Sequence, residues 1–417
     1  MSAVVLQPGA ADPHPAYAAL RQAGPIHWSE DFFGGAWVLT RHADAEQVLR
    51  DPRFSAARTG GWVRRGETQR REAGAFQRLF ARALLFLDGQ DHAGLRRLMM
   101  AGFDGQAMAA LRPWIEQRCT ALMDALQAEQ AAAPERPVDW IAGVARRLPA
   151  GVISRLLGLP AEDEPMLVGW SDEIAPFLGA ADPSPEVTRR AERALVAMAG
   201  YFRSHFARSP GAAAQEPAGL LDRLLLAHRQ GQAGLDDSVG LLAQATMLLF
   251  AGHETTRHLL GNAVQLLLTH PVQWQALRAD PGLAPAAVRE ALRHQCPVQY
   301  SGRRVVTPLE LHGQRLERGD GVIVLIGAAN RDPERFERPD DFDIALPRRA
   351  SLAFGSGPHV CIGAALTRLE GEIMLGQLAR RWPHLALARP ETPDWVPDQP
   401  LYRGLRSLPL WLQGPPA

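Results

Sequence analysis

The sequence predicts a mainly helical protein with small β-sheets, and three observations support this fold class. Apolar residues recur at helical spacing through most of the chain. The longest such run extends from about Asp237 to Thr269. Strand-like runs gather in only two places, residues 25–41 and 302–328. Because the chain shows no internal repeat and no low-complexity linker, we expect one domain over residues 1–417.

The first half of the chain alternates helical patterns with breaks. Helical patterns cover residues 13–24, 43–52, 92–103 and 108–129, and several more follow between residues 138 and 230. Residues 25–41 read as a pair of strands turning around Gly34 and Gly35. Residues 58–83 are rich in Arg, Gly and Gln and predict a loop region.

The second half begins with the long helix and ends with another. A short helix is expected over residues 285–293, followed by strands within 302–316 and 321–328. Residues 330–350 are rich in proline and predict a meandering loop. The last helix is expected from about Cys361 to about Trp382.

Composition excludes several classes of function. Acidic and basic residues balance at 45 each, so no global charge favours nucleic acid or an anionic membrane. Three cysteines are too few and odd in number for a disulfide framework, which favours the reducing cytoplasm. The N-terminus resembles neither a signal peptide nor a membrane anchor, and the apolar run at residues 241–252 is too short to span a bilayer.

The stretch FGSGPHVCIG, residues 354–363, carries the strongest signal in the chain. Cys361 stands where a loop is expected to become a helix, and a helix start favours a thiolate and lowers its pKa. The glycines at 355, 357 and 363 let the backbone approach a flat or bulky group. A thiolate held in this way is a good ligand for haem iron. For a lone cysteine, a buried residue in a tight turn is the plainer alternative.

This stretch resembles the haem-binding signature of the cytochrome P450 family. Every specified position of that signature is filled, by Phe354, Gly355, Gly357, His359, Cys361 and Gly363. The resemblance extends over about residues 15–412 and implies the cytochrome P450 fold, a triangular prism of helices with a β-rich lobe. It further implies heme b between the long central helix and the cysteine-loop helix, with Cys361 as the axial thiolate ligand of the iron.

The long helix contains the stretch LLFAGHETTRHLL, residues 248–260, in which Gly252 weakens the helix. We expect a local widening there, although a glycine-kinked core helix with a solvated Glu is also open. By resemblance to the oxygen-binding groove of the family, Thr255 is the catalytic alcohol and Glu254 the proton-relay acid. Ala251 leaves room for O2, and His253 is expected to pack or form a hydrogen bond rather than bind metal.

Two further groups of residues follow the family pattern. Glu290 and Arg293 lie three positions apart on one helix face and resemble the family's buried structural pair, although a surface ion pair is the ordinary alternative. The third member of that triad is usually an arginine, and Leu346 stands in its place here, so Arg348 or Arg349 is left to substitute.

The haem propionates require charged partners. The resemblance assigns this role to His92, Arg96, Arg303 and His359. Arg304 is the neighbour that competes with Arg303 for the assignment, and each of these residues taken singly could be an ordinary surface cation.

The function implied by the resemblance is oxidation, most simply hydroxylation, of a small and largely apolar molecule in bacterial secondary metabolism or catabolism. The reaction uses O2 and two electrons, and because no redox module is fused to the chain, a ferredoxin with its reductase, or a flavodoxin, is expected as donor. Arg97 and Arg368 are candidates for the donor surface, and a monomer is expected.

The substrate pocket is predicted only in outline. We expect it to involve Met247, Ala251 and Val298 together with the segments 58–87 and 166–206, although Met247, Phe250 and Val298 fit the core equally well. The six arginines between Arg64 and Arg82 suit a solvated face or an acidic substrate. Three rival functions stay open: a haem-thiolate peroxygenase or isomerase that does not use O2, a non-catalytic haem-binding protein, and a structural protein without haem.

Overall fold

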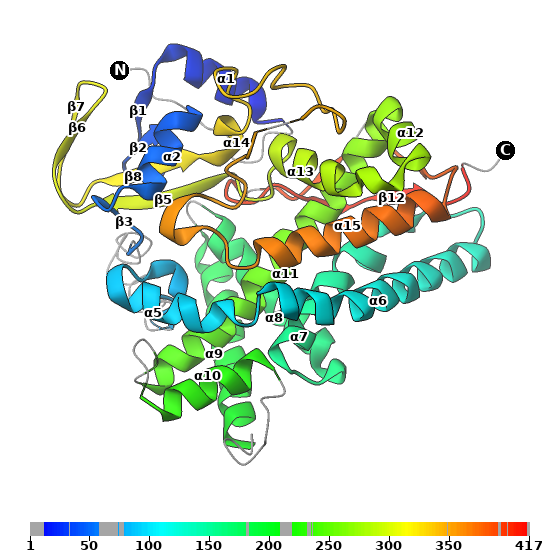
Figure 1. The fold of residues 1–417 in the computed structure, drawn as a ribbon, viewed down its shortest axis with the longest axis horizontal. Helices are drawn as coiled ribbons and strands as arrows, with labels where there is room; N and C mark the ends of the chain where they lie inside the picture. Colours follow the sequence, from blue (N-terminus) through cyan, green and yellow to red (C-terminus); the bar gives the residue numbers. More distant parts are fainter. Residues whose placement is uncertain are drawn as a thin grey trace.

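Most helices gather on one side of the molecule and most strands on the other (Figure 1). The structure, a computed structural model, describes residues 12–32, 34–57, 74, 79–180, 183–208, 219–231, 235, 237–347, 349–390, 393–397 and 399–414. The two termini of this described part lie at opposite ends of the molecule (Figure 1).

The helices occupy most of the predicted positions. Their bounds are α1 (His14–Ala23), α2 (His42–Arg50), α5 (Gly89–Met100), α6 (Gly105–Ala132), α7 (Arg147–Leu157), α8 (Glu164–Gly179), α9 (Pro185–Arg208), α10 (Leu220–Arg229), α11 (Ser238–Thr269), α12 (Pro271–Ala279), α13 (Ala284–His294), α14 (Ile326–Ala329) and α15 (Ala364–Arg381). Short turns of tighter or wider helix occur at Leu84–Phe86, Ile141–Ala145, Ala161–Asp163, Pro281–Leu283 and Gly357–His359.

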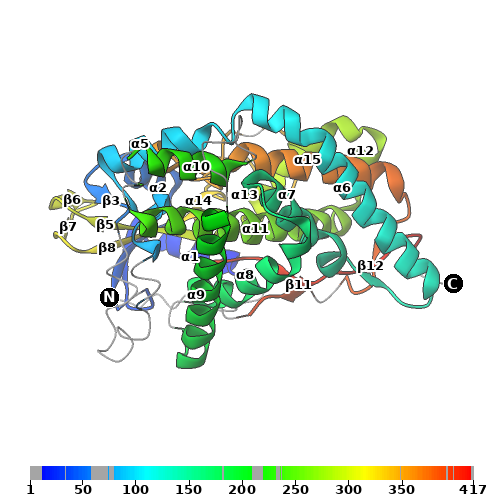
Figure 2. The same ribbon diagram turned by 90° about the horizontal axis from the view of Figure 1, so that it is seen from below.

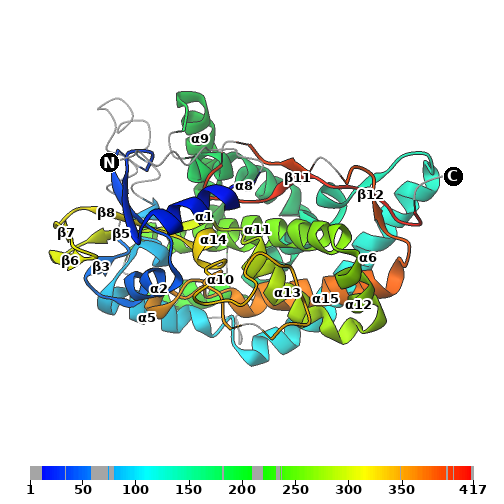
Figure 3. The same cartoon turned by 90° about the horizontal axis from the view of Figure 1, so that it is seen from above.

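Helix α11 is the axis of the helical part and runs lengthwise through the molecule in views from below and from above (Figures 2 and 3). Asp237 caps its first turn by accepting a hydrogen bond from the Gly240 backbone N–H at 2.6 Å. The helix is apolar on nearly all sides, and a helix of that kind must be surrounded by protein. Helices α7, α8, α9, α13 and α15 all pack against it.

The strands form one sheet of five and three smaller sheets. The bounds are β1 (Ile26–Ser29), β2 (Ala36–Leu39), β3 (Phe54–Ser55), β4 (Val138–Asp139), β5 (Tyr300–Val305), β6 (Leu309–Leu311), β7 (Gln314–Leu316), β8 (Gly321–Leu325), β9 (Ala386–Leu387), β10 (Asp394–Trp395), β11 (Leu405–Ser407) and β12 (Pro409–Trp411). The largest sheet has the order β1-β2-β8-β5-β3. The antiparallel pair β1 and β2 confirms the predicted turn, with Ile26 opposite Leu39.

Three expectations about individual elements are wrong. The short strands β4 and β9–β12 were missed because two or three residues are too few for an alternating pattern. Residues 326–328 belong to helix α14 rather than to the preceding strand. Helix α15 begins at Ala364, so Cys361 lies just before the helix rather than at its first residue.

In the described ranges, no helix combines the length and the hydropathy needed to cross a membrane.

Candidate functional site

The cysteine loop is held by its own backbone. The Cys361 N–H donates to the Phe354 carbonyl at 2.8 Å, and the Gly355 N–H donates to the Leu352 carbonyl at 2.8 Å. Gly355 and Gly357 have φ values of +73° and +71°, which only glycine adopts readily. A Cβ on Gly357 would also lie 2.9 Å from the Leu49 carbonyl oxygen of α2. The glycines therefore serve the fold of the loop itself.

Cys361 is the exposed one of the three free cysteines, whereas Cys119 and Cys296 are buried. Burial of the surrounding loop raises the pKa of the Cys361 thiol, and the Gly363 N–H and Arg96 only partly oppose this effect. The predicted lowering of that pKa is therefore wrong for the protein alone, because desolvation outweighs the nearby donors. A metal ion would remove the proton on binding, since the ligand form of cysteine is the thiolate.

One face of α11 is open in an otherwise buried helix. Ala251 is exposed, and Met247 and Thr255, four residues before and after it, are half-buried. Residues this far apart share a helix face, so these three residues form one face of α11, which we call the open face. Thr255 Oγ1 donates a hydrogen bond to the Ala251 carbonyl at 3.1 Å. Thr256 Oγ1 lies 3.2 Å from Thr367 Oγ1 and ties this part of α11 to the helix that follows Cys361.

The predicted widening of α11 is not present, because the α-helix is continuous from Ser238 to Thr269. Gly252 has a different purpose: a Cβ there would lie 2.7 Å from the Ile153 side chain of α7. The glycine allows α7 to pack directly on the backbone of α11. The neighbouring His253 places Nε2 3.1 Å from the Arg146 carbonyl, in line with the expected hydrogen-bonding histidine.

Four predicted cationic residues from α5, β5 and the cysteine loop come together. The rings of His92 and His359 lie 4.1 Å apart. Burial, with help from His92 and Arg303, lowers the pKa of His359 to about 4. Burial also lowers the pKa of Arg303 to about 10, and Arg96 is close enough to Cys361 to influence its pKa.

Two of these groups, His92 and Arg303, lack an anionic partner within the described residues, whereas His359 faces Asp88. His92 Nε2 is buried without a hydrogen-bond partner in the described residues. Arg303 donates to Ser301 Oγ at 3.0 Å and to the Gly302 carbonyl at 2.8 Å, and forms no ion pair within the part of the chain that the structure describes. Its neighbour Arg304 is only half-buried, so the structure favours Arg303 over Arg304 for this group.

Asp88 was missed in the sequence. It accepts hydrogen bonds from the Ser55 hydroxyl and from the backbone N–H groups of Ala56 and Ala57, at 3.2 and 3.3 Å. It also lies 3.3 Å from His359 Nε2. The only sequence signal is an acidic residue directly before a helix, which ordinarily indicates a cap, but its side chain makes no capping hydrogen bond.

These residues fit a haem. An exposed thiol stands just before α15, the helix that Thr367 joins to α11, and the unpartnered imidazole of His92 and the guanidinium groups of Arg96 and Arg303 belong to the same cluster of described residues. A porphyrin with two carboxylates would satisfy the cations, and its iron would take the thiolate.

The Glu254 side chain does not lie on the open face of α11 with Thr255. Its side chain is only 2% exposed; one oxygen lies 3.0 Å from His258 Nε2, and the other 3.3 Å from Arg257 Nη1. Burial opposes its ionisation, but Arg257 and His258 outweigh burial and bring the pKa of Glu254 to about 2. The carboxylate is therefore a buried and paired anion rather than a solvated one.

Glu290 and Arg293 form a buried bidentate pair, with N–O distances of 2.8 and 2.7 Å. The backbone of the meander takes part: Arg293 donates to the Pro339 and Asp341 carbonyls, and the Asp343 N–H donates to Glu290 at 3.1 Å.

The structure describes Leu346 and Arg349, two of the residues considered for the third position of the triad. Leu346 is half-buried, and Arg349 is exposed. Arg348 lies outside the described residues.

The predicted pocket residues divide into two kinds. Met247 and Val298 are partly buried, and Val298 forms an isolated bridge with Tyr402. Phe250 is only 3% exposed and belongs to the core. Of the six arginines between 64 and 82, only Arg82 is described, and it pairs with Asp237.

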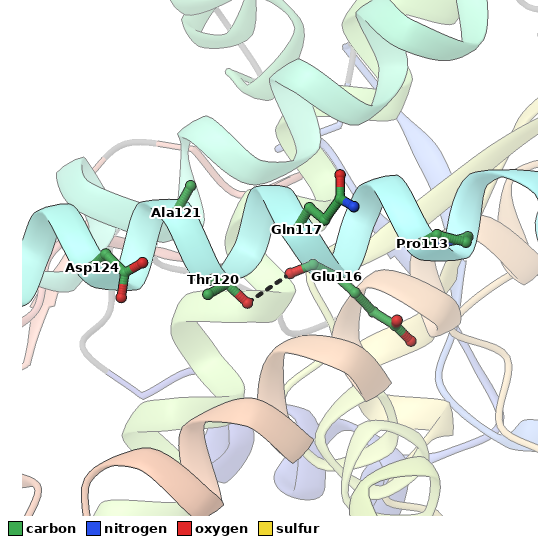
Figure 4. Close-up of a pocket in the computed structure, with 6 residues that line it drawn as sticks. All are labelled: Pro113, Glu116, Gln117, Thr120, Ala121 and Asp124. Atoms are coloured by element: carbon green, nitrogen blue, oxygen red, sulfur yellow. Dashed lines mark hydrogen bonds between the residues drawn. The ribbon is translucent and has the colours of Figure 1, made fainter.

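A shallow open groove lies elsewhere, along one helix only (Figure 4). It is lined by Pro113, Glu116, Gln117, Thr120, Ala121 and Asp124 of α6. Thr120 Oγ1 donates to the Glu116 carbonyl at 2.9 Å. The groove contains none of the predicted site residues, and its polar groups Thr120 and Asp124 also bond to Gln377 and Arg381 of α15.

Fold and site together define a haem-thiolate protein built around one long central helix. A family model described as cytochrome P450 matches residues 21–281 and 282–394. The chain is 38% identical over 409 residues to the cytochrome P450 monooxygenase PikC of Streptomyces venezuelae, covering 97% of this chain and 92% of that protein.

Two further comparisons agree. The pentalenic acid synthase of Streptomyces avermitilis is 35% identical and covers 96% of this chain and 94% of its own length. Among solved structures, the tirandamycin C-bound P450 monooxygenase TamI superimposes with a TM-score of 0.84 at 33% identity, covering 96% of this chain and 98% of that one. The chain belongs to the cytochrome P450 family, and it is a haem-thiolate monooxygenase that oxidises a small molecule.

Proposed function

We propose that Cys361 binds the haem iron and that His92, Arg96, Arg303 and His359 hold the two propionates. The observation that supports this assignment is a group of cationic and imidazole side chains near an exposed cysteine, in which His92 Nε2 has no hydrogen bond and Arg303 no ion pair within the described residues, whereas His359 faces Asp88. Phe354, Gly355 and Gly363 form the rest of the cradle. When bound, the haem supplies the activation of O2 and the transfer of one oxygen atom to the substrate.

The residues of α11 are proposed to control the distal side. Ala251 leaves space over the open face of α11 because its side chain is a single methyl group. The Thr255 hydroxyl donates a hydrogen bond to the Ala251 carbonyl, and its oxygen can accept a hydrogen bond from a group bound at the open face. Glu254, fixed one residue away, is the proposed acid through which protons arrive from the solvent side.

The substrate is proposed to be a small, largely apolar molecule of secondary metabolism. Met247 offers apolar surface on the open face of α11, and Val298 is a second partly buried apolar residue. Relatives bear on this point through their names, which include a vitamin D(3) 25-hydroxylase from Pseudonocardia autotrophica and the pentalenic acid synthase.

The electron donor is proposed to be a separate ferredoxin with its reductase, or a flavodoxin. Arg97 and Arg368 are exposed and can face an acidic protein. The Arg368 guanidinium lies 4.8 Å from the centre of the Phe354 ring, next to the cysteine loop. Residues 1–417 are proposed to work as one monomeric domain, and the free thiols favour the cytoplasm.

Carbon monoxide binding to the reduced protein tests the haem assignment. The expected result is the absorption band specific to thiolate-ligated haem, and its loss in Cys361→Ser. Arg303→Leu should weaken haem retention, measured as haem released to a competing apoprotein, whereas Arg304→Leu should not. The assignment is wrong if Cys361→Ser keeps the band or if the two arginine variants lose haem equally.

The source of oxidising power needs a separate experiment. A library of apolar compounds is screened for the low-spin to high-spin optical shift, and each compound found is then turned over with ferredoxin and reductase or with peroxide. Faster product formation with the electron donors supports the proposal. Turnover with peroxide alone would favour the peroxygenase alternative.

A further inference from the structure

Glu254 is joined to a network of charged residues that reaches the surface. Its two carboxylate oxygens contact His258 and Arg257, which follow it one helical turn later on α11. Arg257 Nη1 also lies 3.2 Å from Asp172 Oδ1 of α8. The second oxygen of Asp172 accepts a hydrogen bond from Arg146, the residue before α7.

Exposure rises step by step along this network. The exposed fraction of the side chain is 2% for Glu254, 13% for Arg257, 30% for Asp172 and 41% for Arg146. A buried ion pair costs desolvation energy that apolar packing would avoid, so four linked charges are not explained by stability alone. The network connects the core of α11 with solvent through helix α8.

His258 occupies a space made for it. Its side chain is fully buried, and in the described residues neither ring nitrogen makes a hydrogen bond, although Nε2 lies within ion-pair distance of Glu254. A Cβ on Gly404 would overlap the His258 ring, so only glycine fits at that position of the C-terminal strands. The fold thus accepts a glycine and an orphaned nitrogen in order to place Nε2 3.0 Å from Glu254.

We propose that Arg257 and His258 are positioning residues for the relay acid, holding Glu254 in its charged form and in one orientation, with Asp172 and Arg146 at the solvent end of the network. This inference rests on the proposed role of Glu254. Arg257 contacts both Glu254 and Asp172, so it joins the relay acid to α8. His258 contacts the other carboxylate oxygen of Glu254 from a fully buried position.

Other titratable groups face the network and must be considered. His253 lies on the same helix beside Glu254, and burial lowers its pKa. Tyr402 faces His258 from the segment between β10 and β11, with ring centres 6.0 Å apart. Neither group contacts a Glu254 oxygen, so Arg257 and His258 are the residues to change.

The test measures the protonated carboxyl group of Glu254 by infrared spectroscopy as pH is lowered, in the reduced, carbon monoxide-bound holoprotein. Its band is assigned by its loss in Glu254→Gln. In Arg257→Met the band should appear roughly one to three pH units higher than in the parent protein, because a cation beside the carboxylate has been removed. Arg257→Lys keeps the charge and should restore most of the parent behaviour.

His258→Gln provides a second, independent variant and should move the band in the same direction. The proposal is overturned if the band appears at the same pH in the parent, Arg257→Met and His258→Gln, or if Arg257→Lys and Arg257→Met behave alike. The carbon monoxide band reports the haem site separately. Its loss in the parent protein would contradict the proposed function, whereas its presence with an unmoved carboxyl band would contradict only the positioning role.

Discussion

Glu370 on α15 provides the sharpest test of the electrostatics of the core. Its side chain is 1% exposed, and Oε2 has no hydrogen-bond partner among the described residues. Burial raises the pKa of Glu370 well above its usual value of 4.5. Between pH 4.5 and its own raised pKa, the folded protein therefore keeps this proton, whereas the unfolded chain releases it.

The effect on stability follows from this difference in protons bound. Above pH 4.5, where the unfolded chain ionises, the folded state loses about 1.4 kcal/mol per pH unit until Glu370 itself ionises. Glu370→Gln keeps the shape and removes the titration, so its stability relative to the parent should improve as pH rises.

The assay is thermal unfolding of the holoprotein at several pH values. For 417 residues the entropy of unfolding is about 0.9 kcal/mol per degree, so about 1.4 kcal/mol per pH unit corresponds to about 1.5 °C in Tm per pH unit. The amide adds a cost of its own from its unpaired N–H groups, about 1–2 kcal/mol, but that cost does not depend on pH. The Tm difference between Glu370→Gln and the parent should therefore grow by about 1.5 °C for each pH unit above pH 4.5, until Glu370 itself ionises in the parent.

Glu372→Gln is the matched control, since this half-buried residue lies two positions further along the same helix. Its Tm difference from the parent should stay constant with pH. The reasoning is refuted if Glu370→Gln also shows a constant difference, because Glu370 would then ionise in the folded protein as it does in the unfolded chain.

Three further predictions concern packing and buried charge. Gly404→Ala should lower Tm, because the new Cβ overlaps the His258 ring and overpacking costs about 1–3 kcal/mol. Gly169→Ala on α8 should instead raise Tm through about 0.5–1 kcal/mol of helix propensity, since a Cβ there meets nothing within 4 Å; a fall in Tm would contradict the packing described. Glu290→Gln should cost about 3–5 kcal/mol by leaving Arg293 buried without its carboxylate, and a denaturant titration showing less than 1 kcal/mol would mean that the pair contributes little.

The sequence predicted those parts of the site that depend on short local patterns. The cysteine loop, the long helix and the pair Glu290–Arg293 each lie within one short stretch of chain, so spacing alone was enough to find them. The choice between Arg303 and Arg304 needed the burial of each side chain, which adjacent positions in a strand do not reveal.

What could not be predicted depends on contacts between distant segments. Asp172 meets Arg257 across 85 positions of sequence, and Asp88 meets His359 across 271. No local pattern records such a contact. The alternative of a solvated Glu254 was wrong, because its side chain is buried against Arg257, which in turn pairs with Asp172 of helix α8.

The tract 251–255 has a consequence for how this enzyme can change its choice of substrate. Successive residues of an α-helix point about 100° apart, so adjacent positions meet different neighbours. Ala251 and Thr255 lie on the open face of α11. Gly252 allows α7 to pack on the backbone, and Glu254 pairs with the charged network. A substitution at any of these positions would break one of these contacts. A change of substrate specificity therefore has to come from side chains outside this turn, such as Met247 and Val298.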